Sequence, residues 1–94
     1  MAEKSHVDGP KKEHKVLLYA LSTCGWCKRT KRLLGEMGVD YDYIDVDQLV
    51  GEDKDQVRQE VTKWNPSCSF PTIVIDDDKC IAGFREDEMR RLLG

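Results

Sequence analysis

The sequence places a CxxC motif, at residues 24–27, between an apolar run and a helical pattern. The run Val16–Leu21 has the length of a strand, and its unbroken apolar character is typical of a strand buried on both faces. From residue 28 to residue 37 apolar side chains recur at helical spacing, and Gly38 is a suitable helix end. The first cysteine of the motif therefore falls at a helix N-terminus, where unpaired N–H groups and the positive end of the helix dipole favour a thiolate.

This arrangement predicts thiol–disulfide exchange, in which a thiolate attacks a disulfide sulfur and a second thiol resolves the mixed disulfide. Cys24 is the candidate nucleophile because it lies at the helix start. Cys27, one turn further in, is the candidate resolving thiol. Lys28 and Arg29 follow in the first helical turn and are expected to stabilise the Cys24 thiolate, the alternative being a solvated basic helix face.

Size and charge exclude several other classes. A chain of 94 residues allows one small domain. Its 15 basic and 18 acidic residues are interleaved and give a net charge of -3, so we expect neither a nucleic acid nor a membrane as partner. The longest apolar run is far shorter than the roughly 20 residues of a spanning helix. Residues 1–15 are polar and unlike a secretory signal, so we expect a cytoplasmic protein.

The remaining patterns indicate an α/β domain over residues 14–94, preceded by a flexible tail over residues 1–13. Further strands are expected at 40–46, 72–75 and 79–82, and apolar residues mark further helices at positions 57, 61 and 64 and at 89, 92 and 93. The first two strands are parallel because a helix connects them. The predicted order is β-α-β-α-β-β-α, with a four-stranded mixed sheet.

This order, with CxxC after the first strand and Phe70-Pro71-Thr72 opening the third, resembles the thioredoxin superfamily in its glutaredoxin-sized form, from about Lys15 to Gly94. Residues 19–31 are similar to dithiol glutaredoxins. Residues 82–87 are similar to the Ser-Gly-Phe-Arg-Pro-Asp signature of NrdH-type redoxins, which a reductase recharges. The resemblance implies a thioredoxin fold and a glutaredoxin-like protein disulfide oxidoreductase that acts as an electron carrier.

The resemblance also implies how a protein substrate is held. It places a cis peptide at Pro71, which would leave the backbone of Phe70 free to pair with an extended substrate segment. The alternative is an ordinary trans proline at a strand start. Trp26, inside the CxxC motif, offers an apolar surface beside the sulfur.

Two departures from the glutaredoxin pattern bear on the electron donor. Leu21 stands where glutaredoxins usually carry a basic partner for a glutathione carboxylate, and Arg85 stands where they tend to carry an acidic partner for its amine, leaving only Glu86 or Asp87 as substitutes. Each charge-assisted contact contributes on the order of 1.5 to 3 kcal/mol, so losing both would weaken glutathione binding a hundredfold or more.

We therefore expect a disulfide reductase, either thioredoxin reductase or a ferredoxin-dependent enzyme, to recharge the protein. It would bind the loop of Gly83, Phe84 and Arg85 through the aromatic ring and the guanidinium. Disulfide-containing proteins are the expected substrates, with ribonucleotide reductase as one candidate, and we expect a monomer. A glutathione-dependent dithiol glutaredoxin is the alternative.

A metal-based function is a further alternative. Monothiol glutaredoxins hold an iron–sulfur cluster, but Cys27 replaces the serine usual in that class. Cys68 and Cys80 are twelve positions apart and lack the second CxxC of zinc ribbons, so we expect no metal and no cofactor beyond the redox-active disulfide. Cys80 is expected to be a small buried apolar residue, and Cys68 a candidate third redox-active thiol.

Overall fold

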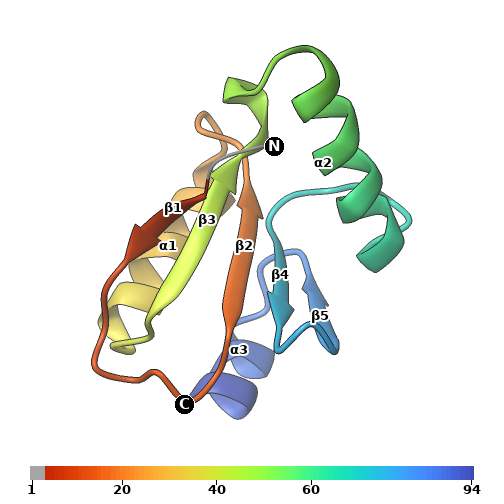
Figure 1. Ribbon diagram of the computed structural model, residues 1–94. Helices are drawn as coiled ribbons and strands as arrows, with labels where there is room; N and C mark the ends of the chain where they lie inside the picture. The colour runs from red at the N-terminus through yellow and green to blue at the C-terminus, as the bar shows by residue number, and fades with distance from the viewer. Residues whose placement is uncertain (1–3) are drawn as a thin grey trace.

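A mixed sheet with the strand order β1-β3-β2-β4-β5 forms the centre of the computed structural model, which describes residues 4–94 (Figure 1). In chain order the elements are β1 (Ser5–Val7), β2 (Val16–Ala20), α1 (Gly25–Glu36), β3 (Tyr41–Asp45), the 3-10 helix η1 (Val46–Gln48), α2 (Gly51–Trp64), β4 (Thr72–Ile75), β5 (Lys79–Ala82) and α3 (Glu86–Leu93). Strand β2 is parallel to β3, and both β1–β3 and β2–β4–β5 pair antiparallel. The predicted α/β class and thioredoxin-like fold are confirmed.

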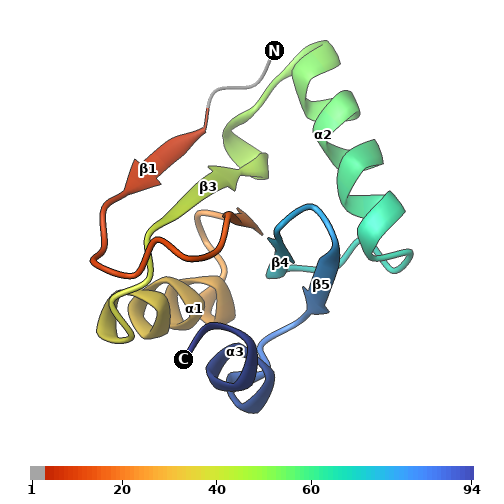
Figure 2. The same ribbon diagram turned by 60° about the horizontal axis from the view of Figure 1, so that its bottom comes forward.

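Helices cover both faces of the sheet: α1 and α3 lie side by side on one face, and α2 lies across the other (Figures 1 and 2). Alternate residues of β2 point to the two layers, since Leu18 belongs to the core under α1 and α3, whereas Tyr19 belongs to the core under α2. In β4, Ile73 and Val74 divide in the same way. Burial on both faces explains the unbroken apolar run that marks β2 in the sequence.

The sheet has five strands rather than the four expected. The additional strand, β1, lies inside the segment expected to be a flexible tail, and it pairs antiparallel with β3. Its three residues carry no periodicity. Besides the backbone pairing, His6 Nδ1 lies 2.6 Å from the Asp42 carboxylate, and the N–H of Gly9, just after the strand, donates to the Asp40 carboxylate at 3.0 Å. Residues 1–3 of the expected tail lie outside the described residues.

The carboxyl end of β3 also differs slightly from expectation. The strand ends at Asp45, one residue earlier than expected, and the chain then turns into η1. This turn brings Asp47 beside the loop that leads from β2 into α1, where Ser22 lies 2.8 Å away through its N–H. Within residues 4–94, no helix is long and apolar enough to cross a bilayer.

Candidate active site

The two cysteines of the CxxC motif lie where β2 ends and α1 begins. Cys24 is the N-cap residue of α1, with the extended backbone angles φ -86° and ψ 121° that an N-cap adopts. Its carbonyl accepts the N–H of Lys28 at 3.1 Å, and its Sγ accepts the N–H of Cys27 at 3.3 Å. The first cysteine thus takes the capping role usually filled by a serine or aspartate oxygen, which points its sulfur at free helix amides.

The two sulfurs differ sharply in exposure. Cys27 is fully buried, and its Sγ accepts the N–H of Leu21 at 3.4 Å, whereas Cys24 is only partly buried and packs against the edge of the same core. A partner disulfide can therefore reach Cys24 and not Cys27.

The surroundings also separate the two thiols electrostatically. Partial burial opposes ionisation of Cys24, but hydrogen bonds from the Cys27 thiol and from the N–H groups of Cys27 and Trp26 outweigh it and lower the pKa of Cys24 below its ordinary value. Burial raises the pKa of Cys27, and the neighbouring Cys24 raises it further, against the opposing effects of the Leu21 N–H and the Lys31 charge. The exposed sulfur is therefore the readily ionised nucleophile, and the buried one remains a thiol until it resolves.

Lys31, which sequence reasoning missed, is the basic residue whose charge acts on Cys27. Its Nζ lies 3.0 Å from the Asp45 carboxylate and 4.1 Å from the centre of the Tyr43 ring. The guanidinium of Arg29 instead lies over the Trp26 ring, with its carbon 5.2 Å from the centroid. The thiolate-stabilising roles of Lys28 and Arg29 stay predictions.

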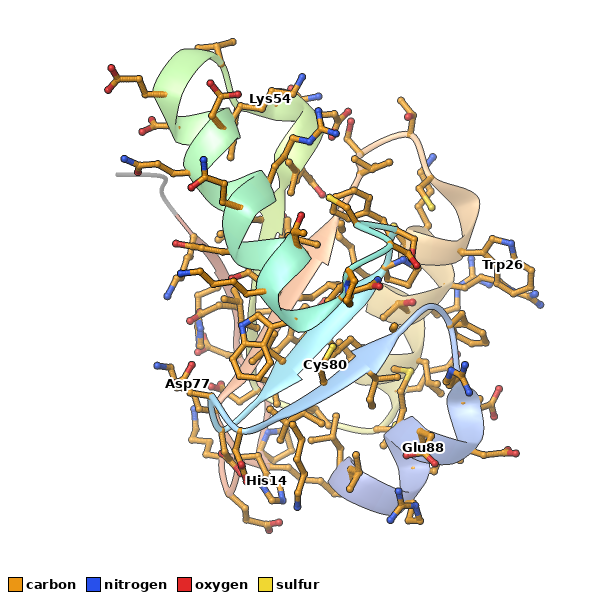
Figure 3. All side chains as sticks on the ribbon, turned by 90° about the vertical axis from the view of Figure 1, so that its right-hand side faces the viewer. His14, Trp26, Lys54, Asp77, Cys80 and Glu88 are labelled. Carbon is orange, nitrogen blue, oxygen red and sulfur yellow. The ribbon has the colours of Figure 1, made fainter. Side chains whose placement is uncertain are left out.

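Trp26 projects from the start of α1 (Figure 3). Its side chain is 54% exposed although it is large and apolar, and its ring lies 5.4 Å from that of Phe84, centroid to centroid. Phe84 precedes α3, so this contact brings the loop after β5 next to the CxxC motif. Two of the residues predicted to bind a partner therefore form one aromatic surface.

The bond between Phe70 and Pro71 is cis, as the resemblance implies. The Pro71 carbonyl accepts the N–H of Gly83 at 2.7 Å, which joins the start of β4 to the loop after β5. Gly83 has a φ of +82°, a conformation that favours glycine. Phe70, Phe84 and Cys24 are all partly buried against the same core. The structure thus gathers the CxxC motif, the cis-proline and the Gly83 loop at one end of the molecule.

Two residues that organise this end were not singled out from the sequence. Asp47 accepts hydrogen bonds from the N–H and the hydroxyl of Ser22, two residues before Cys24. Asn65 is buried, and its amide donates to the Ser69 hydroxyl at 2.9 Å and to the Thr72 hydroxyl at 3.1 Å, which shapes the loop before Pro71. Both contacts are hydrogen bonds between polar side chains and loops, so neither had a local signal in the sequence.

Leu21 and Arg85, the two departures from the glutaredoxin pattern, lie in different loops. Leu21 is partly buried and packs against the core under α2. Arg85 is exposed at the beginning of α3, and its Nε donates to the Ala82 carbonyl at 3.2 Å. The guanidinium is therefore held beside the Gly83 loop.

The other two cysteines lie apart from the motif. Cys68 is partly buried in the loop after α2, with a φ of +48°, and Cys80 lies on β5 opposite Val74, where burial raises its pKa. Among residues 4–94, the only group of three potential metal ligands close enough to share one ion is His6, Asp8 and Asp40 at the β1–β3 edge. No cysteine belongs to that group.

Comparison with known proteins agrees with this geometry. The family model described as Glutaredoxin matches residues 16–81. A glutaredoxin-like 8.6 kDa protein from the rubredoxin operon of Clostridium pasteurianum is 32% identical over 78 residues, which cover 83% of this chain and 96% of that protein. The structure of the glutaredoxin from Methanosarcina mazei Go1 has a TM-score of 0.87 at 50% identity and covers 97% of this chain and 87% of its own. Methanoredoxin from Methanosarcina acetivorans has a TM-score of 0.82 at 49% identity, with coverage of 85% and 84%.

The family match spans the CxxC motif, the cis-proline and most of the sheet, and the structural neighbours cover nearly the whole domain. The chain belongs to the glutaredoxin family of thiol–disulfide oxidoreductases.

Proposed function

We propose that this oxidoreductase carries electrons to protein disulfides and is recharged by a disulfide reductase rather than by glutathione. The observation that carries the choice of donor is the presence of Leu21 and Arg85 where glutaredoxins usually place a basic and an acidic partner for glutathione. An apolar side chain at the first position leaves a glutathione carboxylate without a cation. A guanidinium at the second position repels the glutathione amine.

The reaction follows from the different states of the two sulfurs. The Cys24 thiolate attacks one sulfur of the substrate disulfide; a Cys24–substrate bond forms, the substrate S–S bond breaks, and the released thiolate takes up a proton. Cys27 then loses its proton and attacks Cys24, which releases the second substrate thiol and leaves a Cys24–Cys27 disulfide. The substrate gains two electrons and the protein loses two.

The reductase would return those two electrons by attacking the exposed sulfur, Cys24. The aromatic surface of Trp26 and Phe84, together with the exposed Arg85, consists of residue types enriched at protein contacts. A cycle that reduces protein disulfides suits a reducing compartment, which supports a cytoplasmic location. The proposed cycle needs no metal and no cofactor in this chain.

The donor is tested by reducing the oxidised protein with millimolar glutathione, with thioredoxin reductase and with a ferredoxin-dependent disulfide reductase. We expect slow reduction by glutathione and fast reduction by one of the enzymes. The double variant Leu21→Lys with Arg85→Asp should raise the rate with glutathione tenfold or more, because it restores two charge-assisted contacts. Phe84→Ala should lower the rate with the reductase.

Arg91→Asp is the matched control, since it reverses a charge on α3 at an exposed position that pairs only with Glu88 among the described residues. This control should leave the rate with glutathione unchanged. Efficient reduction of the unaltered protein by glutathione would contradict the proposal and favour the glutathione-dependent alternative.

A further inference from the structure

A groove leads away from the active site between α1 and α3. It has a volume of about 460 Å³, and its lining residues include Trp26, Phe84, Arg29, Arg32, Glu36, Glu86 and Arg90. Trp26 lies in the first turn of α1 and Phe84 just before α3, so both helices begin beside the CxxC motif and the aromatic pair forms the end of the groove nearest Cys24.

The charges in the groove are not balanced. Arg90 is neutralised by Glu86, with Nε 2.9 Å from the carboxylate. Within residues 4–94, neither Arg29 nor Arg32 forms an ion pair, and the guanidinium of Arg29 lies over the ring of Trp26. Three arginines against two glutamates leave the groove positive, and Arg29 lies at its aromatic end, over Trp26.

We infer that this groove binds the segment of a protein substrate that flanks its target cysteine, and that it selects segments with an apolar side chain next to that cysteine and a carboxylate further along. The inference rests on the proposed reduction of protein disulfides. An apolar side chain beside the cysteine would cover the exposed part of the Trp26 side chain, and a carboxylate would pair with Arg32.

The helix geometry sets the spacing between the two recognised side chains. Trp26 and Arg32 are six residues apart on α1, which is about 9 Å along the helix axis at a rise of 1.5 Å per residue. An extended substrate strand covers that distance in about three residues, at roughly 3.3 Å each. The preferred carboxylate therefore lies about three positions beyond the apolar residue, counted away from the cysteine.

The test uses the reduced protein in single turnover, so that no electron donor enters the measurement. The substrates are end-blocked synthetic peptides joined as disulfide dimers, each with phenylalanine next to the cysteine and either aspartate or lysine three positions further, built in both chain directions. In at least one direction we expect the aspartate peptide to be reduced about three to ten times faster than the lysine peptide, as for a partly exposed ion pair. Raising the salt to about 1 M should remove most of the difference.

Two groove variants and one control outside it assign the effect to the groove. Arg32→Glu should reverse the preference, while Arg91→Glu, which makes the same charge change on α3 outside the groove, should preserve it. Trp26→Ala should slow the phenylalanine peptides more than matched peptides that carry glycine instead.

Equal rates for the aspartate and lysine peptides in both directions would overturn the inference while leaving the reductase activity itself intact. The inference would also be overturned if Arg32→Glu changed the rate of recharging by the reductase but not the rate of peptide reduction, because the groove would then serve the electron donor. If the reduced protein reduced no peptide disulfide at all, the proposed function would fail and the inference with it.

Discussion

At the scale of single residues, the environment of each sulfur assigns its role. Cys24 is reachable and readily ionised, whereas Cys27 is buried and held as a thiol. We predict that Cys24→Ser abolishes disulfide reduction and that Cys27→Ser accumulates a mixed disulfide between Cys24 and the substrate. Mass spectrometry after incubation with a protein disulfide measures both outcomes. A stable mixed disulfide through Cys27 in the Cys24→Ser variant would reverse the assignment.

The pH dependence of the site follows from the lowered pKa of Cys24. Thiolate absorbance of the reduced protein should show one transition below the roughly 8.5 of a free cysteine, and the Cys24→Ser variant should lack it. Because the folded state lowers this pKa, ionisation stabilises the reduced protein above the pKa of the unfolded thiol, and the stabilisation is lost as the pH falls through the folded-state value. A midpoint at or above the free-cysteine value would remove the proposed activation of Cys24.

At the scale of elements, the loop between α2 and β4 depends on Asn65. Its buried amide donates to Ser69 and Thr72, so Asn65→Ala should lower the free energy of unfolding by about 1 to 3 kcal/mol and slow substrate reduction by displacing Pro71. Urea titration and single-turnover rates measure the two effects. Ser67→Ala is the matched control in the same loop, where the side chain is exposed. Equal stability of both variants would show that the amide bonds do not hold the loop.

The sequence predicted best those helices and strands in which the spacing of apolar residues follows the buried face. The run Val16–Leu21 and the helical spacing of Val57, Val61 and Trp64 have their expected positions because their side chains form the two cores. The contacts of Asp47 and Asn65 could not be predicted, since they are hydrogen bonds from polar side chains to loops whose course depends on the finished fold. Strand β1 was not predicted, because three residues are too few to show an alternation of apolar and polar side chains.

At the scale of the whole molecule, we expect the β1 edge to respond to pH through His6. The hydrogen bond to Asp42 is the main cause that raises the pKa of His6, and the charges of Asp40, Asp42 and Asp8 raise it further, whereas desolvation lowers it. Lys12 forms an ion pair with Asp40 beside His6. A raised pKa means that protonated His6 stabilises the docked strand below the unfolded-state value and that this contribution is lost as the pH rises through the folded-state value.

We therefore predict that amide exchange in β1, corrected for its intrinsic pH dependence, becomes faster as the pH rises through the folded-state pKa of His6. His6→Ala should remove the change. His14→Gln is the control, because His14 pairs with Asp76 in the turn between β4 and β5. Exchange in β1 that does not vary with pH would show that the backbone pairing alone holds this strand.

The active site is assembled from distant segments of the chain. The family resemblance predicted this arrangement, whereas the residue patterns did not predict it. No periodicity relates the CxxC motif to Pro71 or Gly83. The hydrogen bond from Gly83 to Pro71 and the ring contact between Trp26 and Phe84 join segments from both halves of the chain. They exist only once β2, β4 and β5 have paired.

The bond from Arg85 to the Ala82 carbonyl has a consequence for aggregation. β5 is the last strand of the sheet, and an open edge strand is a template for pairing with another molecule. Arg85 already occupies one of its carbonyls, and Arg85 and Glu88 line the hollow beside Cys80. A strand from a second molecule would have to break that bond and desolvate both charges, so we expect the end of β5 nearest the Gly83 loop to resist fibre-like stacking.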